Sequence, residues 1–263
     1  MKTYPFVLLL TGLLFACGSD ESKTEATTET VASASKTATL VFLDKSQSVN
    51  ANQEFVTQKY GRVLSELVKK NMIEPQDKLE VWLIHENTAK GKALELTLKT
   101  EMPSTEGMSP TDVEAAQSNY DLSLQRERLN FTNQILAQLK TPNDSKSSEQ
   151  TDIQASLGAI EESLEKGYTV KAYFFSDMVE SMKEAGRRDL HQTLPHSSQQ
   201  ADEWAKADAA KIKSKYPDLT GVSVVMVLPF EPTTSSKVNN PVITDYWKTF
   251  FKSLGVASVE ETN

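Results

Sequence analysis

The fold is decided by the stretch Ala38-Thr39-Leu40-Val41-Phe42-Leu43-Asp44-Lys45-Ser46-Gln47-Ser48 of this 263-residue chain. Its first six residues are almost all apolar, which is typical of a buried strand. The run ends in one carboxylate and two alternating hydroxyl groups, in the pattern D-x-S-x-S. Such oxygens are hard ligands that suit a small hard cation such as Mg²⁺. The end of this strand is therefore a candidate cation site.

The rest of the sequence alternates between strand-like and helix-like segments. Further apolar runs predict buried strands at residues 79–84, 170–176 and 222–229. Three- and four-residue apolar periodicity predicts helices at residues 50–70, 112–139, 151–164, 201–215 and 245–254. Residues 92–100 alternate apolar and polar side chains, as in a half-exposed strand that follows its neighbour in an antiparallel hairpin. We therefore expect an α/β fold: a doubly wound, mostly parallel sheet with one antiparallel edge strand and helices on both faces.

Two later residues extend the candidate site. Asp177 ends the strand-like run 173–176, and Thr151 opens a predicted helix. Ligands of open α/β sheets bind beyond the carboxyl ends of the strands, so Asp44 and Asp177 are expected at one edge. Each residue also has a purely structural explanation, because Ser and Thr cap helices and Asp follows strands in turns.

The order of these motifs resembles that of von Willebrand factor type A (vWA) domains. Their metal-ion-dependent adhesion site uses D-x-S-x-S after the first strand, a Thr in a later loop and an Asp after the fourth strand. The resemblance covers nearly all of residues 37–254. It implies a Mg²⁺ or Mn²⁺ site with an open position for an acidic side chain of a protein partner. The implied metal ligands are Asp44, Ser46, Ser48, Thr151 and Asp177.

The sequence departs from the vWA pattern in two places. Met178 stands where many members have Gly directly after the Asp. The region between the predicted edge strand and Thr151 is also longer than in a minimal domain. The sequence alone does not say which backbone conformation Met178 adopts. It also does not say what the longer region before Thr151 forms.

The N-terminal residues are typical of a bacterial lipoprotein. Residues 1–16 contain Lys2 and an apolar stretch, and Leu14-Phe15-Ala16-Cys17 resembles a lipobox, so Cys17, the only cysteine, is expected to be acylated. Residues 17–36 are rich in Ser, Thr, Ala and Glu and predict a disordered tether. Residues 37–259 are left for the vWA-like domain. We expect a lipid-anchored protein of the cell envelope that faces either the periplasm or the cell exterior.

The charge pattern narrows the function. The chain has 28 Lys and Arg against 36 Asp and Glu, for a net charge of −8. No basic patch with interleaved aromatics is visible, so nucleic-acid binding is not expected. The short basic pair Arg187-Arg188 is expected at the surface. These features favour a non-enzymatic module that binds a protein partner through a divalent cation.

Two other functions remain open from the sequence. An apolar strand followed by Asp44 also resembles the start of a haloacid-dehalogenase-type phosphatase, although Ser46 stands where that chemistry needs a second Asp. Alternatively, the chain could be a metal-independent scaffold of the envelope that uses the long helix from Asp112.

Overall fold

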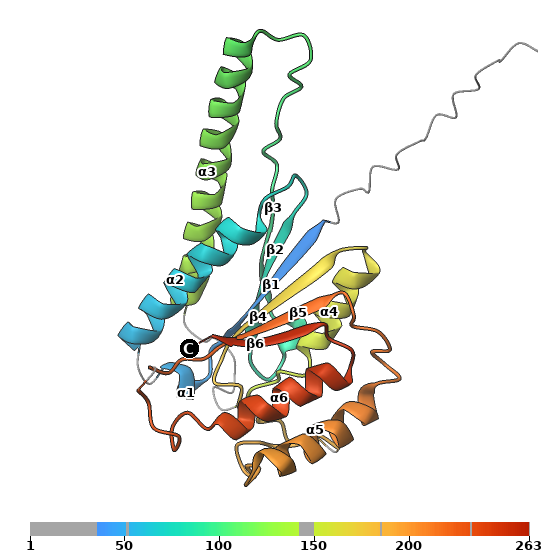
Figure 1. Ribbon diagram of the computed structural model, residues 1–263. Helices are drawn as coiled ribbons and strands as arrows, with labels where there is room; N and C mark the ends of the chain where they lie inside the picture. The colour runs from blue at the N-terminus through green and yellow to red at the C-terminus, as the bar shows by residue number, and fades with distance from the viewer. Residues whose placement is uncertain (1–35, 51–52, 142–149, 185, 232, 263) are drawn as a thin grey trace, which may run out of the picture. The chain divides into compact units, whose positions relative to one another are not determined.

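The computed structural model describes residues 36–50, 53–141, 150–184, 186–231 and 233–262. These form a six-stranded sheet in the order β3-β2-β1-β4-β5-β6 (Figure 1). The only antiparallel pairing in the described sheet joins β2 to the edge strand β3. The predicted fold class is therefore confirmed. The strands are β1 (Thr37–Asp44), β2 (Lys78–Ile84), β3 (Lys92–Thr97), β4 (Thr169–Phe175), β5 (Val222–Val227) and β6 (Ser258–Thr262).

Helices cover both faces of the sheet (Figure 1). One face packs on α2 (Gln53–Asn71) and α3 (Pro110–Lys140), with the short α1 (Gln47–Asn50) following β1. The other face packs on α4 (Ser156–Glu165), α5 (Ser198–Ile212) and α6 (Pro241–Ser253). A 3-10 turn, η1 (Thr88–Lys90), connects β2 to β3.

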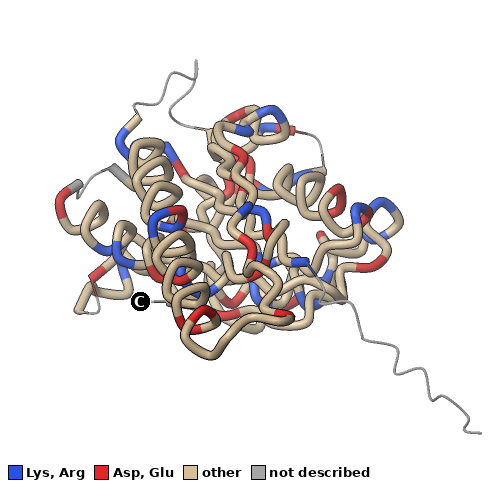
Figure 2. The backbone as a smooth tube through the Cα atoms, turned by 90° about the horizontal axis from the view of Figure 1, so that it is seen from above, with Lys and Arg blue, Asp and Glu red and all other residues tan. Residues whose placement is uncertain are grey.

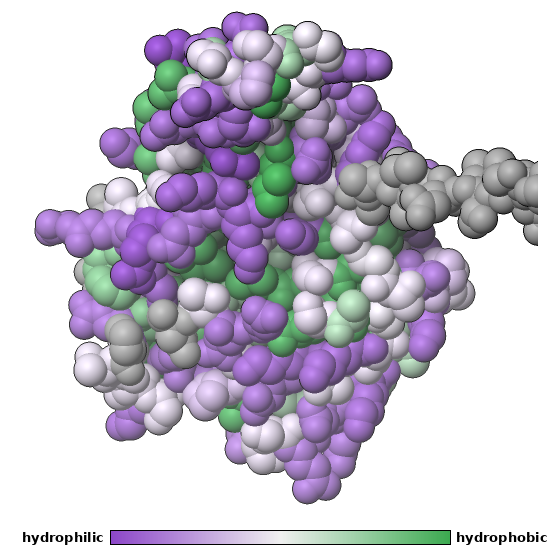
Figure 3. Space-filling model, turned by 45° about the horizontal axis from the view of Figure 1, so that its top comes forward, coloured by the Kyte–Doolittle hydropathy of each residue, from purple (hydrophilic) through white to green (hydrophobic). Residues whose placement is uncertain are grey.

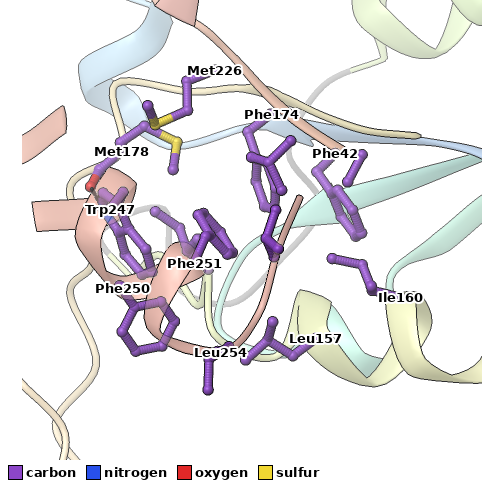
Figure 4. Close-up of a cluster of buried hydrophobic side chains, with 14 of the residues drawn as sticks. Phe42, Leu157, Ile160, Phe174, Met178, Met226, Trp247, Phe250, Phe251 and Leu254 are labelled. Atoms are coloured by element: carbon purple, nitrogen blue, oxygen red, sulfur yellow. Dashed lines mark hydrogen bonds between the residues drawn. The ribbon is translucent and has the colours of Figure 1, made fainter. Parts of the chain in front are cut away.

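Successive side chains of the central strands point to opposite faces of the sheet, and this divides the hydrophobic core into two clusters. Phe42 of β1 stacks on Phe174 of β4, with ring centroids 4.8 Å apart, and both face α4 and α6 (Figure 4). The next residues along these strands, Leu43 and Phe175, pair in the sheet and face α2 and α3. Both strands are buried on both faces over most of their length, which is why their sequences are mostly apolar.

The long α3 extends well beyond the sheet (Figure 1). Ser109 caps the N-terminus of α3: its hydroxyl accepts a hydrogen bond from the Asp112 N–H, and Pro110 occupies the first turn. Every residue from 99 to 123 is exposed or only half-buried. Only Leu124, Phe131 and Ile135 of this helix are buried. The longer region that the sequence indicated before Thr151 is therefore an arm that stands out from the domain.

The surface carries both signs of charge. Acidic and basic residues are interspersed over the described helices (Figure 2). Hydrophilic side chains predominate on the face in Figure 3, where apolar groups form scattered patches. In the described part of the chain, no helix combines the length and the apolar character needed to cross a bilayer.

Two elements differ from the sequence-based expectation. The helix expected from Thr151 begins only at Ser156: the residues before it form tight turns, in which the N–H groups of Ser156 and Leu157 donate to the carbonyls of Ile153 and Gln154. The N–H groups of Ile153 and Gln154 donate to the Glu180 carboxylate. The edge strand β6 was not predicted, since its sequence Ser-Val-Glu-Glu-Thr is mostly polar. The expected signal peptide, Cys17 and nearly all of the tether lie outside the described residues.

Candidate functional site

Asp44 is the last residue of β1 and joins two loops at the carboxyl edge of the sheet. Its side chain is buried, and Oδ1 accepts a hydrogen bond of 2.8 Å from the Ser46 N–H. Its Oδ2 accepts a hydrogen bond of 2.5 Å from the Ser176 hydroxyl. Ser176 follows β4, the neighbour of β1 in the sheet. The adjacency of parallel strands thus brings the D-x-S-x-S loop against the loop that carries Asp177.

Four of the five predicted residues come together at this edge. The hydroxyl oxygens of Ser46 and Ser48 lie 3.1 Å apart, within hydrogen-bond distance. The Ser48 hydroxyl lowers the pKa of the Asp177 carboxyl group and so lies beside it, and Asp177 Oδ1 accepts a hydrogen bond of 3.0 Å from the Val179 N–H. Ser48 is exposed whereas the other three are buried. The cluster is therefore built on a buried base and opens to solvent at Ser48.

The two carboxyl groups of this cluster repel one another. Burial, together with the charge of Asp177, raises the pKa of Asp44 to about 7. Burial also raises the pKa of Asp177, and the hydrogen bond from Ser48 opposes the shift. Both pKa shifts mean that the charged carboxylates are unfavourable in this place, because no positive charge of the described residues fully neutralises them there. A divalent cation bound between the carboxylates would supply that charge.

The donor set fits a hard cation that needs few carboxylates. Among the described residues, no group of three or more His, Cys, Asp and Glu side chains is placed to hold a metal ion. The cluster offers two carboxylates and two serine hydroxyls instead. Mg²⁺ and Mn²⁺ accept oxygen ligands, and Mg²⁺ keeps several of its waters, so this set suits them better than it suits Zn²⁺.

Thr151, the fifth predicted residue, reaches the Asp177 loop through its main chain. Its N–H donates a hydrogen bond of 3.0 Å to the Ser181 hydroxyl, and its carbonyl accepts one of 3.0 Å from the Ser181 N–H. Thr151 is buried. The segment is therefore fixed beside the residues that follow Asp177, and metal binding by the Thr151 hydroxyl stays a prediction.

A buried ion cluster clamps these two segments together. Arg187 binds the carboxylates of Asp152, at 2.6 Å, and of Glu180. Glu180 Oε2 also accepts a hydrogen bond of 2.7 Å from the Ile153 N–H. Burial raises the pKa of Glu180 to about 7, and the Arg187 charge opposes that shift. The Arg187 side chain is only 15% exposed, so the expectation of a surface residue was wrong. Its partner Asp152 is 35 residues away in the sequence, so only the fold identifies this contact.

The neighbouring Arg188 is also engaged. Its Nε donates a hydrogen bond of 2.7 Å to Asp208, and its guanidinium lies 4.0 Å from the ring centroid of Trp204. Both partners belong to α5. The basic pair therefore attaches the long loop after β4 to two different parts of the domain.

Lys45, the second residue of D-x-S-x-S, connects the candidate site to α3. Its buried Nζ donates hydrogen bonds to the main-chain carbonyls of Gln138, Leu139 and Thr141, at 2.7–2.8 Å. The last carbonyls of a helix have no partner within the helix, and a cation there also complements the helix dipole. Burial lowers the pKa of Lys45 to about 8. The loop that carries Ser46 thereby caps the helix that forms the arm.

Met178 explains how the chain departs from the vWA pattern. Its φ is +63°, in the left-handed region that normally favours Gly. Its side chain is fully buried near Met226 and Trp247 (Figure 4), and its carbonyl accepts a hydrogen bond of 2.7 Å from Trp247 Nε1. The backbone after Asp177 thus has the shape that Gly adopts readily, and core packing stabilises Met in that shape.

The fold and site can now be compared with known proteins. The described domain has an α/β fold with a mostly parallel six-stranded sheet and one antiparallel edge strand. No protein-family model and no curated protein matches the chain. Among solved structures, manganese-loaded TRAP of Plasmodium vivax is 12% identical, with a TM-score of 0.35, over 79% of this chain and 62% of that chain.

Two other solved structures are similar at the same level. A vWA protein from Catenulispora acidiphila is 12% identical, with a TM-score of 0.34, over 84% of this chain and 43% of that chain. Mussel byssus PTMP1 with a zinc-occupied MIDAS motif is 13% identical, with a TM-score of 0.34, over 87% and 44%. The chain spans less than two thirds of each of these structures. The assignment of the fold rests on the strand order and the antiparallel edge strand of its own sheet.

Proposed function

We propose that this protein binds a divalent cation, Mg²⁺ or Mn²⁺, between Asp44 and Asp177 and uses it to hold an acidic group of a protein partner. One observation supports this most strongly: two buried carboxyl groups with raised pKa values share an edge with two adjacent serine hydroxyls. The proposed ligands are Asp44, Ser46, Ser48, Thr151 and Asp177, some of which act through water.

The chemistry of capture follows from this donor set. Hydroxyl ligands carry no charge, so a dication bound mainly by them retains a strong attraction for an anion. A carboxylate from a partner can complete the coordination at the exposed side, near Ser48. Charge pairs of this kind are strong when both groups are partly desolvated. Holding a partner in this way requires no catalytic group, and we propose a non-enzymatic role.

The proposed location is the bacterial cell envelope. We propose that Cys17 carries the lipid anchor and that the following residues, up to about 36, form the tether. Support comes from the sequence Leu14-Phe15-Ala16-Cys17 alone. Two or more acyl chains give durable anchoring, since each buried methylene contributes about 0.8 kcal/mol. Mass spectrometry of the native N-terminus tests this point, and an unmodified Cys17 would contradict it.

Chelation provides the direct test of partner capture. The immobilised full chain should retain a protein from envelope extracts with Mg²⁺ present and release it when EDTA is added. Asp44→Asn should retain none, whereas Asp121→Asn should behave as the wild type, because Asp121 is exposed on α3. Retention that survives both EDTA and Asp44→Asn would contradict the proposal.

The projecting arm supports a second candidate, a metal-independent scaffold. Leu122 and Leu129 are 51% and 60% exposed and lie seven residues apart, on one side of α3. If this surface holds the partner, replacing both leucines with Asn should abolish capture while EDTA has no effect. The same capture experiment therefore separates the two functions.

A further inference from the structure

Tyr60 has a buried hydroxyl that makes no hydrogen bond within the described part of the chain. The residue belongs to α2, its side chain is 1% exposed, and its Oη has no hydrogen-bond partner among the described residues. Leaving such a group unpaired is unfavourable, and most buried polar groups in native proteins are paired. A phenylalanine would fill the same space without that penalty. The hydroxyl therefore has room in its hydrogen-bonding for a partner other than the described residues.

The position of Tyr60 points to the candidate metal site. Its ring packs edge-to-face on Phe175, with centroids 4.9 Å apart and an interplanar angle of 78°. Phe175 is the last residue of β4 and stands two positions before Asp177. The neighbouring core residues Leu43 and Val49 flank the D-x-S-x-S loop in the sequence. Tyr60 thus lies beneath both loops that form the site.

The electrostatics are consistent with this position. Burial and the negative charges of Asp44 and Asp177 raise the pKa of Tyr60 well above its usual value. The phenol is therefore neutral and keeps its proton at physiological pH. A neutral hydroxyl that feels both carboxylates is suited to donate a hydrogen bond to a water molecule or an oxygen between them.

We propose that Tyr60 is a positioning residue for the bound cation: its hydroxyl donates a hydrogen bond to a water molecule of the ion's hydration shell. This rests on the proposed function of the Asp44–Asp177 site and adds a residue to it. Mg²⁺ retains several waters when a protein binds it, so such a water is expected. Outer-shell hydrogen bonds of this kind typically change metal affinity 10–100-fold.

Replacing Tyr60 with Phe provides a test in which a structural role and a metal role have different signatures. Calorimetric titration of the full chain with Mn²⁺ should show affinity about 10–100-fold lower for Tyr60→Phe than for the wild type. Without metal, in EDTA, its melting temperature should be unchanged or higher, because an unpaired buried hydroxyl has been removed.

Tyr173→Phe is the matched control. Its hydroxyl accepts a hydrogen bond of 3.1 Å from Asn71 Nδ2 in the same core cluster. This variant should lower the melting temperature in EDTA and leave the Mn²⁺ affinity unchanged. Equal Mn²⁺ affinity in the wild type and Tyr60→Phe would overturn the inference while the proposed function stands. A lower melting temperature of metal-free Tyr60→Phe would also overturn it, since the hydroxyl would then have a protein partner. A wild type that binds no Mn²⁺ would overturn the proposed function as well.

Discussion

The Ser176 hydroxyl donates a hydrogen bond of 2.5 Å to Oδ2 of Asp44, although the two residues are 132 positions apart in the chain. The same hydroxyl oxygen accepts a hydrogen bond of 2.9 Å from the Met178 N–H. One side chain therefore orients the first carboxylate of the site and shapes the loop around the second. Without metal, this arrangement holds two carboxyl groups close together in a buried place, and that proximity has a measurable cost.

The stability of the metal-free protein should depend on pH in an unusual direction. The pKa of Asp44 is raised from 3.8 to about 7 in the folded state. A raised pKa means that folding favours the protonated form, so this stabilisation is present below pH ~4 and is lost as pH rises through ~7. In EDTA, the free energy of unfolding should fall by up to about 4 kcal/mol over that range, at about 1.4 kcal/mol per pKa unit. Denaturant titrations at several pH values measure it.

Asp44→Asn is the control for this pH dependence. The amide cannot ionise, so the variant should lose the Asp44 contribution to the fall between pH 4 and 7 and keep that of Glu180, whose pKa is also raised to about 7. At pH 8 the metal-free variant should therefore be more stable than the wild type. Saturating Mn²⁺ should stabilise the wild type at pH 8 and leave the variant unchanged. A wild type whose stability in EDTA falls between pH 4 and 7 no more steeply than that of the variant would contradict the account.

Lys45→Met should destabilise the end of α3. Three main-chain carbonyls would lose their charged donor, which should cost about 1.5–3 kcal/mol of unfolding free energy. Hydrogen exchange should also become faster in the last turn of this helix. Lys140→Met is the matched control, because Lys140 is exposed in the same turn and should change stability by less than about 0.5 kcal/mol. Equal effects of the two substitutions would show that Lys45 is not a cap.

Arg187→Met should be among the most destabilising single substitutions in this domain. It would leave the carboxylates of Asp152 and Glu180 buried without a cation, and breaking a buried ion pair from one side costs about 3–5 kcal/mol. Arg126→Met, on the exposed face of α3, should cost less than about 0.5 kcal/mol. If urea titration gives the same midpoint for both variants, the buried ion cluster does not hold the Thr151 segment in place.

At Met178, Gly should be tolerated better than Ala. Both substitutions remove a buried side chain, but only Gly adopts the left-handed φ of +63° without a steric penalty of about 1–2 kcal/mol. Met178→Gly should therefore be about 1 kcal/mol more stable than Met178→Ala. At Met226, a buried residue of the extended strand β5, we expect the Ala variant to be more stable than the Gly variant, because Gly weakens a strand. Thermal unfolding of the four variants measures both orders.

Sequence patterns predicted the sheet because its signals are local. Each central strand is mostly apolar, and parallel strands necessarily end at one edge, so Asp44 and Asp177 could be placed together without coordinates. The start of α4 could not be predicted to the residue, because the segment before it is held by distant groups: the Glu180 carboxylate that the Ile153 N–H binds is 27 residues away. Long-range contacts of this kind have no signature in a local window.

The same limit applies to the cations near the site. Lys45 reads as a spacer within D-x-S-x-S, and one of its acceptors lies 94 residues away, at the end of a helix that no local pattern pairs with this loop. Arg187 reads as a surface residue because solvent exposure is the usual state of arginine. In both cases the sequence shows a basic residue, but the fold determines which carbonyl or carboxyl groups that residue contacts.

A calorimetric titration of the full chain with Mg²⁺ and with Mn²⁺ at pH 7.5 tests the central claim most directly, with Asp44→Asn measured in parallel. The account predicts saturable binding of one ion per wild-type chain and no binding by the variant. Absence of binding in the wild type, or equal binding by wild type and Asp44→Asn, would contradict it.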